Sequence, residues 1–176
     1  MIDTISARLA RGIKNTVPEH PASLAVLKFA IAVVLNVAFI IALTLGASLF
    51  TGNTTEAALI LISFAMLRQV TGGVHLKSGT ACVLLTTALF TLLSYVDMNT
   101  AYVQVLNVTS LALVLWLAPI GIERQTRIPK RHWPKLKGIA AALIILNILF
   151  CSPVIAASFF VQSITLLLTW KGVKSI

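Results

Sequence analysis

The sequence predicts an all-α membrane protein, a polytopic bundle of about six transmembrane helices preceded by an amphipathic helix. Of its 176 residues, 58% are hydrophobic and only 11% are charged, whereas a soluble domain typically carries roughly 25% charged residues. Long apolar segments recur along the chain, and each crossing of a bilayer needs about 20 apolar residues. A surface so poor in charge must face lipid, and we expect a single membrane domain over residues 1–176.

The N-terminal segment 2–17 has the pattern of an amphipathic helix. Its apolar residues recur every three or four positions, at Ile2, Ile5, Leu9 and Ile13, and basic residues occupy its other faces. This pattern is typical of a helix that lies in the headgroup region of a membrane. A solvated basic tail is the alternative, because the apolar stripe is short.

Six apolar segments follow, separated by polar turns. They cover residues 24–50, 57–67, 80–96, 101–120, 138–152 and 154–170. We expect the second segment to stop at Arg68. The second and fifth segments are short for a hydrocarbon core of roughly 30 Å. The absence of a convincing internal repeat weighs against a transporter built from inverted halves.

The basic residues fall on one side of this arrangement. If the six segments alternate across the membrane, all of the 14 Lys and Arg residues except Lys28 lie on the side of the two termini. The positive-inside rule then predicts that both termini and the segments 68–79 and 121–137 are cytoplasmic, with the turns 51–55 and 97–100 outside. The net charge of +9 thus indicates topology and anionic lipid, and no nucleic-acid partner is expected.

A polar string before the third apolar segment contains the candidate chemistry. It reads Arg68-x3-Gly72-Gly73-x-His75-x-Lys77-Ser78-x3-Cys82. Histidine and cysteine are the base and the nucleophile of a thiol peptidase. On an unbroken helix their spacing would keep His75 and Cys82 about 10 Å apart. The chain must therefore turn between them if they act together.

The same string contains the residues that such a turn needs. Its glycines free the backbone, and Ser78 or Thr80 can cap the third transmembrane helix. Cys82 would then lie in the first turn, where the positive end of the helix favours a thiolate and unpaired backbone N–H groups can hold an oxyanion. The alternative is a packing cysteine, which is how we interpret Cys151.

The string resembles the motif of the accessory gene regulator B (AgrB) family, membrane peptidases that mature quorum-sensing peptides in Gram-positive bacteria. The matching residues are Arg68, Gly73, His75, Lys77-Ser78 and Cys82, followed by Ala118-Pro119 ahead of a basic loop with Lys130 and Arg131. Residues 122–126 resemble the family's Asn- and Lys-rich sequence only loosely, so the cognate peptide stays open.

The resemblance implies a cysteine endopeptidase in the bacterial cell membrane. Cys82, activated by His75, would cleave a small propeptide near its C-terminus and keep the remainder as a thioester. An internal Cys or Ser of that peptide would then release a cyclic thiolactone or lactone. The residues implied in substrate binding or loop positioning are Arg68, Gly72, Gly73, Lys77, Ser78, Lys130 and Arg131. No metal or other cofactor is expected, since the sequence has neither a P-loop nor a metal-ligand cluster. A homodimer is possible, and the sequence does not decide whether it forms.

A non-catalytic transporter or export partner of a signalling peptide is the alternative function. A transporter should place polar residues at mid-membrane on facing helices. The candidates are Asn36, Gln104, Asn107, Asn147 and Gln162, and none of them is charged. In a membrane scaffold, a third alternative, the spacing of His75 and Cys82 would be accidental.

Overall fold

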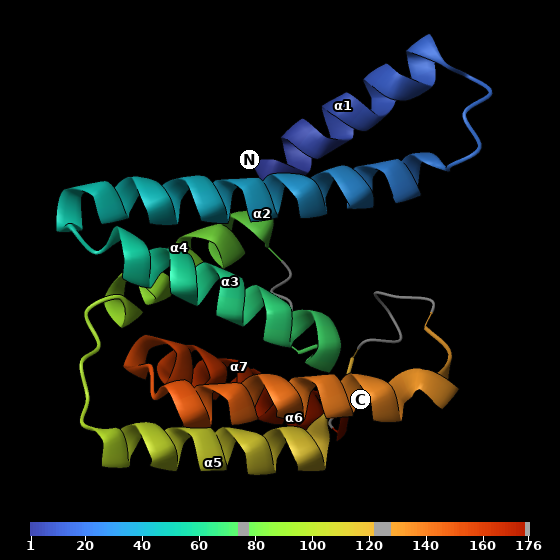
Figure 1. The fold of residues 1–176 in the computed structure, drawn as a ribbon. Coiled ribbons are helices and arrows are strands. Elements are labelled where there is room, and N and C mark those ends of the chain that lie inside the picture. Colours follow the sequence, from blue (N-terminus) through green and yellow to red (C-terminus); the bar gives the residue numbers. More distant parts are fainter. Residues whose placement is uncertain (74–77, 122–127, 175–176) are drawn as a thin grey trace. The chain divides into compact units, whose positions relative to one another are not determined.

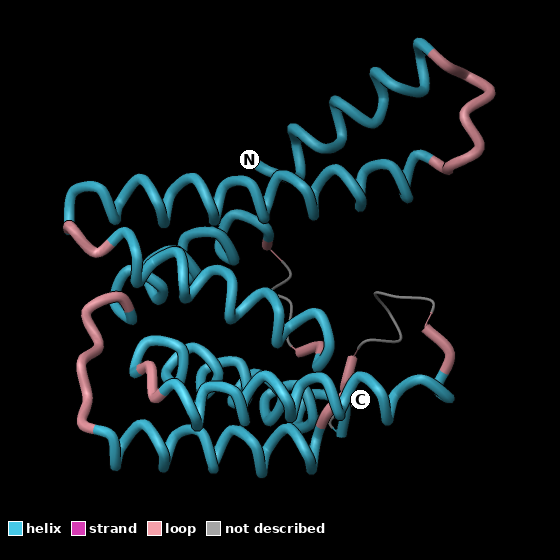
Figure 2. Tube along the Cα trace, in the orientation of Figure 1, coloured by secondary structure: helices cyan, strands magenta, loops and turns pink. Residues whose placement is uncertain are grey.

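A computed structural model describes residues 1–73, 78–121 and 128–174 of the chain. Within these ranges the secondary structure is helical and the helices are joined by loops, as the composition predicts (Figure 2). The helices form two units. The first comprises Met1–Gly52 and His75–Thr91, and the second comprises Asn53–Val74 and Leu92–Ile176.

The first unit contains α1 (Ile2–Thr16), α2 (Leu24–Thr51) and most of α4 (Gly79–Leu93). Ser23 caps α2 by accepting a hydrogen bond from the Val26 N–H, and Gly52 ends it in the left-handed conformation, with φ of 78°. The 28 residues of α2 extend about 42 Å at 1.5 Å per residue. This length is sufficient to cross a bilayer.

The helix predicted at the N-terminus is present as α1, and it packs against α2. Its buried face consists of Ile2, Ser6 and Ala10, spaced four residues apart. Leu9 and Ile13 are 48% and 37% exposed, so part of the predicted apolar stripe lies open beside the basic residues. An exposed stripe of this kind suits a helix at a membrane surface.

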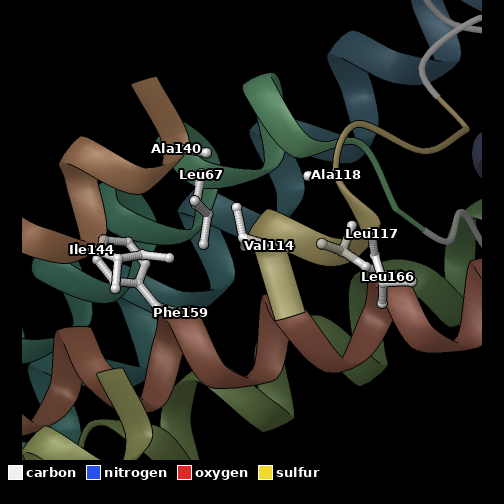
Figure 3. Packing of buried hydrophobic residues seen from close by; sticks show 8 residues of the cluster. All are labelled: Leu67, Val114, Leu117, Ala118, Ala140, Ile144, Phe159 and Leu166. Atoms are coloured by element: carbon white, nitrogen blue, oxygen red, sulfur yellow. The ribbon is translucent and has the colours of Figure 1, made fainter. Parts of the chain in front are cut away.

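In the described part of the second unit four helices form a bundle, in which α5, α6 and α7 lie side by side (Figure 1). Its helices are α3 (Thr54–Thr71), α5 (Thr100–Leu117), α6 (Trp133–Phe150) and α7 (Pro153–Lys174), with a 3-10 turn η2 (Lys130–His132) before α6. Figure 3 shows the hydrophobic core of this unit, which consists of Leu67, Val114, Leu117, Ala118, Ala140, Ile144, Phe159 and Leu166.

The helices α3 and α7 run in the same direction. The Ser63 hydroxyl contacts the Ser158 hydroxyl at 3.0 Å, and further along both helices the Gln162 amide contacts the Thr71 hydroxyl at 3.0 Å. Three helices, α4, α5 and α6, separate α3 from α7 in the chain, and an odd number of alternating helices gives the two flanking helices the same direction. The shared direction agrees with the alternation expected of the second and sixth apolar segments.

Polar residues inside the bundle join helices to one another. The Asn147 amide donates to Asn107 Oδ1 at 3.0 Å, and the Gln104 amide donates to the Ile148 carbonyl at 2.8 Å. Such bonds hold helices together in membranes. Three of the polar residues that the transporter alternative required therefore have a role in helix packing.

Four of the described helices are long and apolar enough to cross a membrane. They are Leu24–Thr51, Thr100–Leu117, Lys130–Phe150 and Pro153–Trp170, while Gly79–Leu93 is apolar but shorter. The predicted boundaries were wrong at two helix ends that bear on the motif. α3 continues through Arg68 to Thr71, because neither glycine nor proline interrupts the helix before Gly72. α5 stops at Leu117, because the residue before Pro119 avoids the helical conformation.

Two further boundaries also differ from the prediction. α4 ends at Leu93, three residues before the expected end at Val96. α6 begins at Trp133, five residues before Gly138, because a proline is compatible with the first turn of a helix. The fifth apolar segment is thereby longer than its hydrophobic residues alone suggested.

Candidate active site

Cys82 lies in the first turn of α4, as predicted. The helix begins at Gly79, and Ser78 caps it. The Ala81 N–H donates to Ser78 Oγ at 3.4 Å, and the Cys82 N–H donates to the Ser78 carbonyl at 3.0 Å. The Cys82 side chain is partly exposed. The sequence allowed either Ser78 or Thr80 as the cap of this helix, and the structure shows that the cap is Ser78.

The break between the second and third apolar segments is also confirmed. α3 ends at Thr71 and α4 begins at Gly79, so a continuous helix from Arg68 through the third segment is excluded. His75 and Lys77 lie outside the described residues. Their contact with Cys82 or with a substrate therefore stays a prediction.

Gly79 allows the N-terminal helix to approach the start of α4. A Cβ at this position would lie 3.3 Å from Cγ2 of Ile2, which is 4% exposed. The sequence suggested that Gly79 provides backbone freedom for a turn. In the structure it is instead a site of close packing, three residues before Cys82.

Gly72 and Gly73 leave the α3 helix and pair with the segment after α5. Gly72 has φ of 77° and Gly73 has φ of 128°, values that strongly favour glycine. The Ile120 N–H donates to the Thr71 carbonyl at 3.0 Å, and the Gly73 N–H donates to the Ile120 carbonyl at 3.2 Å. We call this parallel pairing of Gly72 with Ile120 the backbone bridge.

Arg68 lies next to the backbone bridge. Its guanidinium carbon is 5.8 Å from the centre of the Phe64 ring, within the range of a cation–π contact. A Cβ on Gly73 would lie 3.7 Å from the nearest Arg68 nitrogen. The structure thus brings together two residues of the motif, Arg68 and Gly73, in the second unit.

Lys130 and Arg131 form the turn η2 before α6, and both are exposed. Lys130 Nζ lies 5.6 Å from the centre of the Trp133 ring, and Arg131 Nε contacts His132 Nε2 at 3.1 Å. Exposed cations of this kind suit an acidic peptide segment or an anionic headgroup. They belong to the second unit, whereas Ser78 and Cys82 belong to the first.

Sequence reasoning missed the residues that hold the backbone bridge, above all Gln162. The Gln162 amide donates to the Gly72 carbonyl at 2.6 Å. The available signal was a glutamine in an apolar segment, since polar side chains inside membranes are costly and usually have a role. The transporter alternative also accounts for a glutamine at this position, so the sequence alone does not assign it to the backbone bridge.

Comparison with known proteins identifies the family. The model of the accessory gene regulator B family matches residues 4–174. A protein of Halalkalibacterium halodurans that is named as AgrB-like is 27% identical over 177 residues, which cover 99% of this chain and 90% of that protein. No solved structure matches the chain. The match extends from α1 to α7 and includes the whole motif, and the chain is a membrane protein that belongs to the AgrB family.

Proposed function

We propose that the protein is a membrane-embedded cysteine endopeptidase that cleaves a small quorum-sensing propeptide at its C-terminal side and releases a cyclic peptide. The observation that carries this proposal is the position of Cys82 in the first turn of a helix capped by Ser78. Membership of the AgrB family supports quorum-sensing peptides as the substrate class.

In the first step, His75 accepts the thiol proton and the Cys82 sulfur attacks the carbonyl carbon of the scissile bond. The first backbone N–H groups of a helix have no acceptor within the helix, and those of Gly79 and Thr80 are the donors that we propose for the oxyanion. The C–N bond breaks, and the leaving amine takes the proton from His75. The N-terminal part of the peptide remains as a thioester on Cys82.

In the second step, an internal thiol or hydroxyl of the bound peptide attacks the thioester carbonyl. The C–S bond breaks, the ring closes, and the Cys82 sulfur regains a proton. Exchange of one thioester for another changes neither the number nor the type of bonds. A thiolactone product therefore requires no nucleotide.

The exposed cations Lys130 and Arg131 are proposed to receive an acidic part of the propeptide. They would also contact anionic lipid, because the positive-inside rule places this segment at the cytoplasmic surface. Arg68 is proposed to position the loop that follows α3, since it lies beside Gly73.

The proposal is tested with purified protein in detergent and synthetic propeptides from neighbouring open reading frames. Mass spectrometry should show a C-terminal fragment and a peptide that is lighter by one water molecule than the linear N-terminal product. The intact protein should carry a transient adduct of that peptide on Cys82. Binding of a propeptide without either product would favour the transporter or export alternative.

Topology gives a second expected result. Single cysteines at Asn53 and Asn99, in a protein without its native cysteines, should react with an impermeant maleimide added to intact cells, because both turns are expected outside. A cysteine at Arg131 should react only after lysis. Labelling of the Arg131 site in intact cells, or protection of both outer sites, would contradict the six-segment arrangement.

A further inference from the structure

The exposed face of α1 is hollowed around Gly12. A shallow groove of about 470 Å³ lies there, lined by Arg8, Leu9, Gly12, Ile13, Thr16 and Val17. On a helix, the residues three and four positions away lie on the same face, so the missing side chain of Gly12 leaves space between its neighbours. A Cβ at Gly12 would meet no atom within 4 Å. We call this hollow the α1 groove.

The two edges of the α1 groove differ in their chemistry. One edge consists of Leu9, Ile13 and Val17, which are 48%, 37% and 48% exposed. The other edge contains Arg8, with Arg11 one helical turn further along, and both arginines are exposed. The α1 groove thus places an apolar wall beside two cations.

A phospholipid has the chemistry that matches both edges. Its acyl chain gains free energy when it covers exposed apolar side chains, and its phosphate accepts paired hydrogen bonds from a guanidinium group. Asp3 and Glu19, the acidic residues of segment 1–23, do not line the groove. A small water-soluble anion would satisfy the arginines and leave the apolar edge in water. The combination therefore favours a lipid.

The position of the α1 groove in the chain places it close to a bilayer. Val17 is seven residues before Leu24, where the candidate span of α2 begins, so the two Cα atoms are at most about 25 Å apart. Lys14 Nζ donates to the His20 carbonyl at 2.6 Å, which fastens the end of α1 to this connection. The positive-inside rule assigns the segment to the cytoplasmic leaflet, which is rich in anionic lipid.

We propose that the α1 groove docks one anionic phospholipid, with its phosphate on Arg8 and Arg11 and an acyl chain along Leu9 and Ile13. A helix that simply lies at a membrane surface needs charge and an apolar stripe, whereas a docked lipid also needs the space at Gly12. The two cases can therefore be separated by filling that space. The proposal does not depend on the proposed reaction.

The test uses the full chain in vesicles and measures which lipid lies beside α1. In a protein without its native cysteines, Asn15→Cys carries a bimane label, because Asn15 is exposed and does not line the groove. Its quenching by doxyl-labelled phosphatidylglycerol or phosphatidylcholine gives the relative binding of the two lipids. Each basic residue near the lipid strengthens binding about fivefold, so phosphatidylglycerol should bind about 25-fold more tightly.

A second label position provides the baseline. Val34 is 67% exposed on α2, and it lies within the apolar span Leu24–Thr51. The same label on Val34→Cys should be quenched almost equally by the two lipids. An equal preference for phosphatidylglycerol at both positions would mean that α1 has no lipid site of its own, and would overturn the proposal.

Gly12→Leu fills the α1 groove and keeps both arginines. It should lower the preference at the Asn15 label to below about fivefold, the level of one basic residue. Leucine is a better helix former than glycine, so α1 is expected to persist. Gly46→Leu is the matched control in α2, since a Cβ there also meets no atom within 4 Å, and it should keep the full preference.

Arg8→Gln leaves the space at Gly12 open and should lower the preference to about fivefold. An unchanged preference in Gly12→Leu would show that charge alone attracts the lipid, without a shaped site, and the proposal would be wrong. Loss of the preference in excess inorganic phosphate would show that the arginines bind a free anion, which would also overturn the lipid as occupant.

Discussion

Cys82→Ala is expected to abolish cleavage of the propeptide while the protein still inserts into the membrane. The thiolate forms the covalent intermediate, and alanine offers no atom in its place. Mass spectrometry of the propeptide measures cleavage, and the amount of protein in the membrane fraction measures insertion. Cys82→Ser preserves the side-chain size, so its inactivity would show that chemistry and not packing is lost.

Cys151→Ala is the matched control, since both cysteines are partly exposed. Cys151 Sγ contacts the Gln104 amide at 3.1 Å and the Ile148 carbonyl at 3.3 Å, which is the environment of a packing cysteine. Activity should therefore stay nearly intact. Equal losses at the two positions would point to packing at both and would undo the assignment of Cys82 as nucleophile.

Gly73→Ala is expected to lower both activity and stability strongly. The new Cβ would lie 2.6 Å from Thr165 Oγ1, and alanine would be held at φ of 128°. A non-glycine residue in such a conformation costs about 1–3 kcal/mol, and relief of the contact would move the backbone bridge. Thermal unfolding in detergent measures the stability, and the propeptide assay measures the activity.

Gly138→Ala controls for the addition of a methyl group, because its Cβ would meet no atom within 4 Å. Alanine should stabilise α6 at this position by about 1 kcal/mol. Thr165→Ala combined with Gly73→Ala removes the close contact but not the backbone strain, so recovery should be partial. Full activity and stability in Gly73→Ala would mean that the site does not depend on the backbone bridge.

Hydrophobic segments predicted the helices well, but polar residues were a poor guide to where helices end. The sequence predicts that this helix stops at Arg68, but arginine is a good helix former. The helix ends at Thr71, where Gly72 adopts a positive φ. The end of α5 at Leu117 could also have been predicted, because Pro119 disfavours the helical conformation in the residue before it.

Contacts in the candidate site between residues that are close in the sequence could be predicted. Contacts between residues that are far apart in the sequence could not. Ser78 and Cys82 follow capping rules that depend on a few neighbouring residues. The bond from Gln162 to Gly72 joins residues that are 90 positions apart in the chain. A single sequence has no signal for such a pairing. The spacing of hydrophobic residues indicates where helices lie in the chain, but it does not indicate which helices are neighbours.

The backbone bridge also provides boundaries for exchanging loops between relatives. Its bonds join the main chains of Thr71, Gly73 and Ile120, and they therefore depend little on which side chains follow. Residues 74–77 and 122–127 could be exchanged for those of another family member, singly or together, with the junctions kept at Gly73 and at Gly121. Chimaeras of this design would assign preference for a propeptide to one segment or the other.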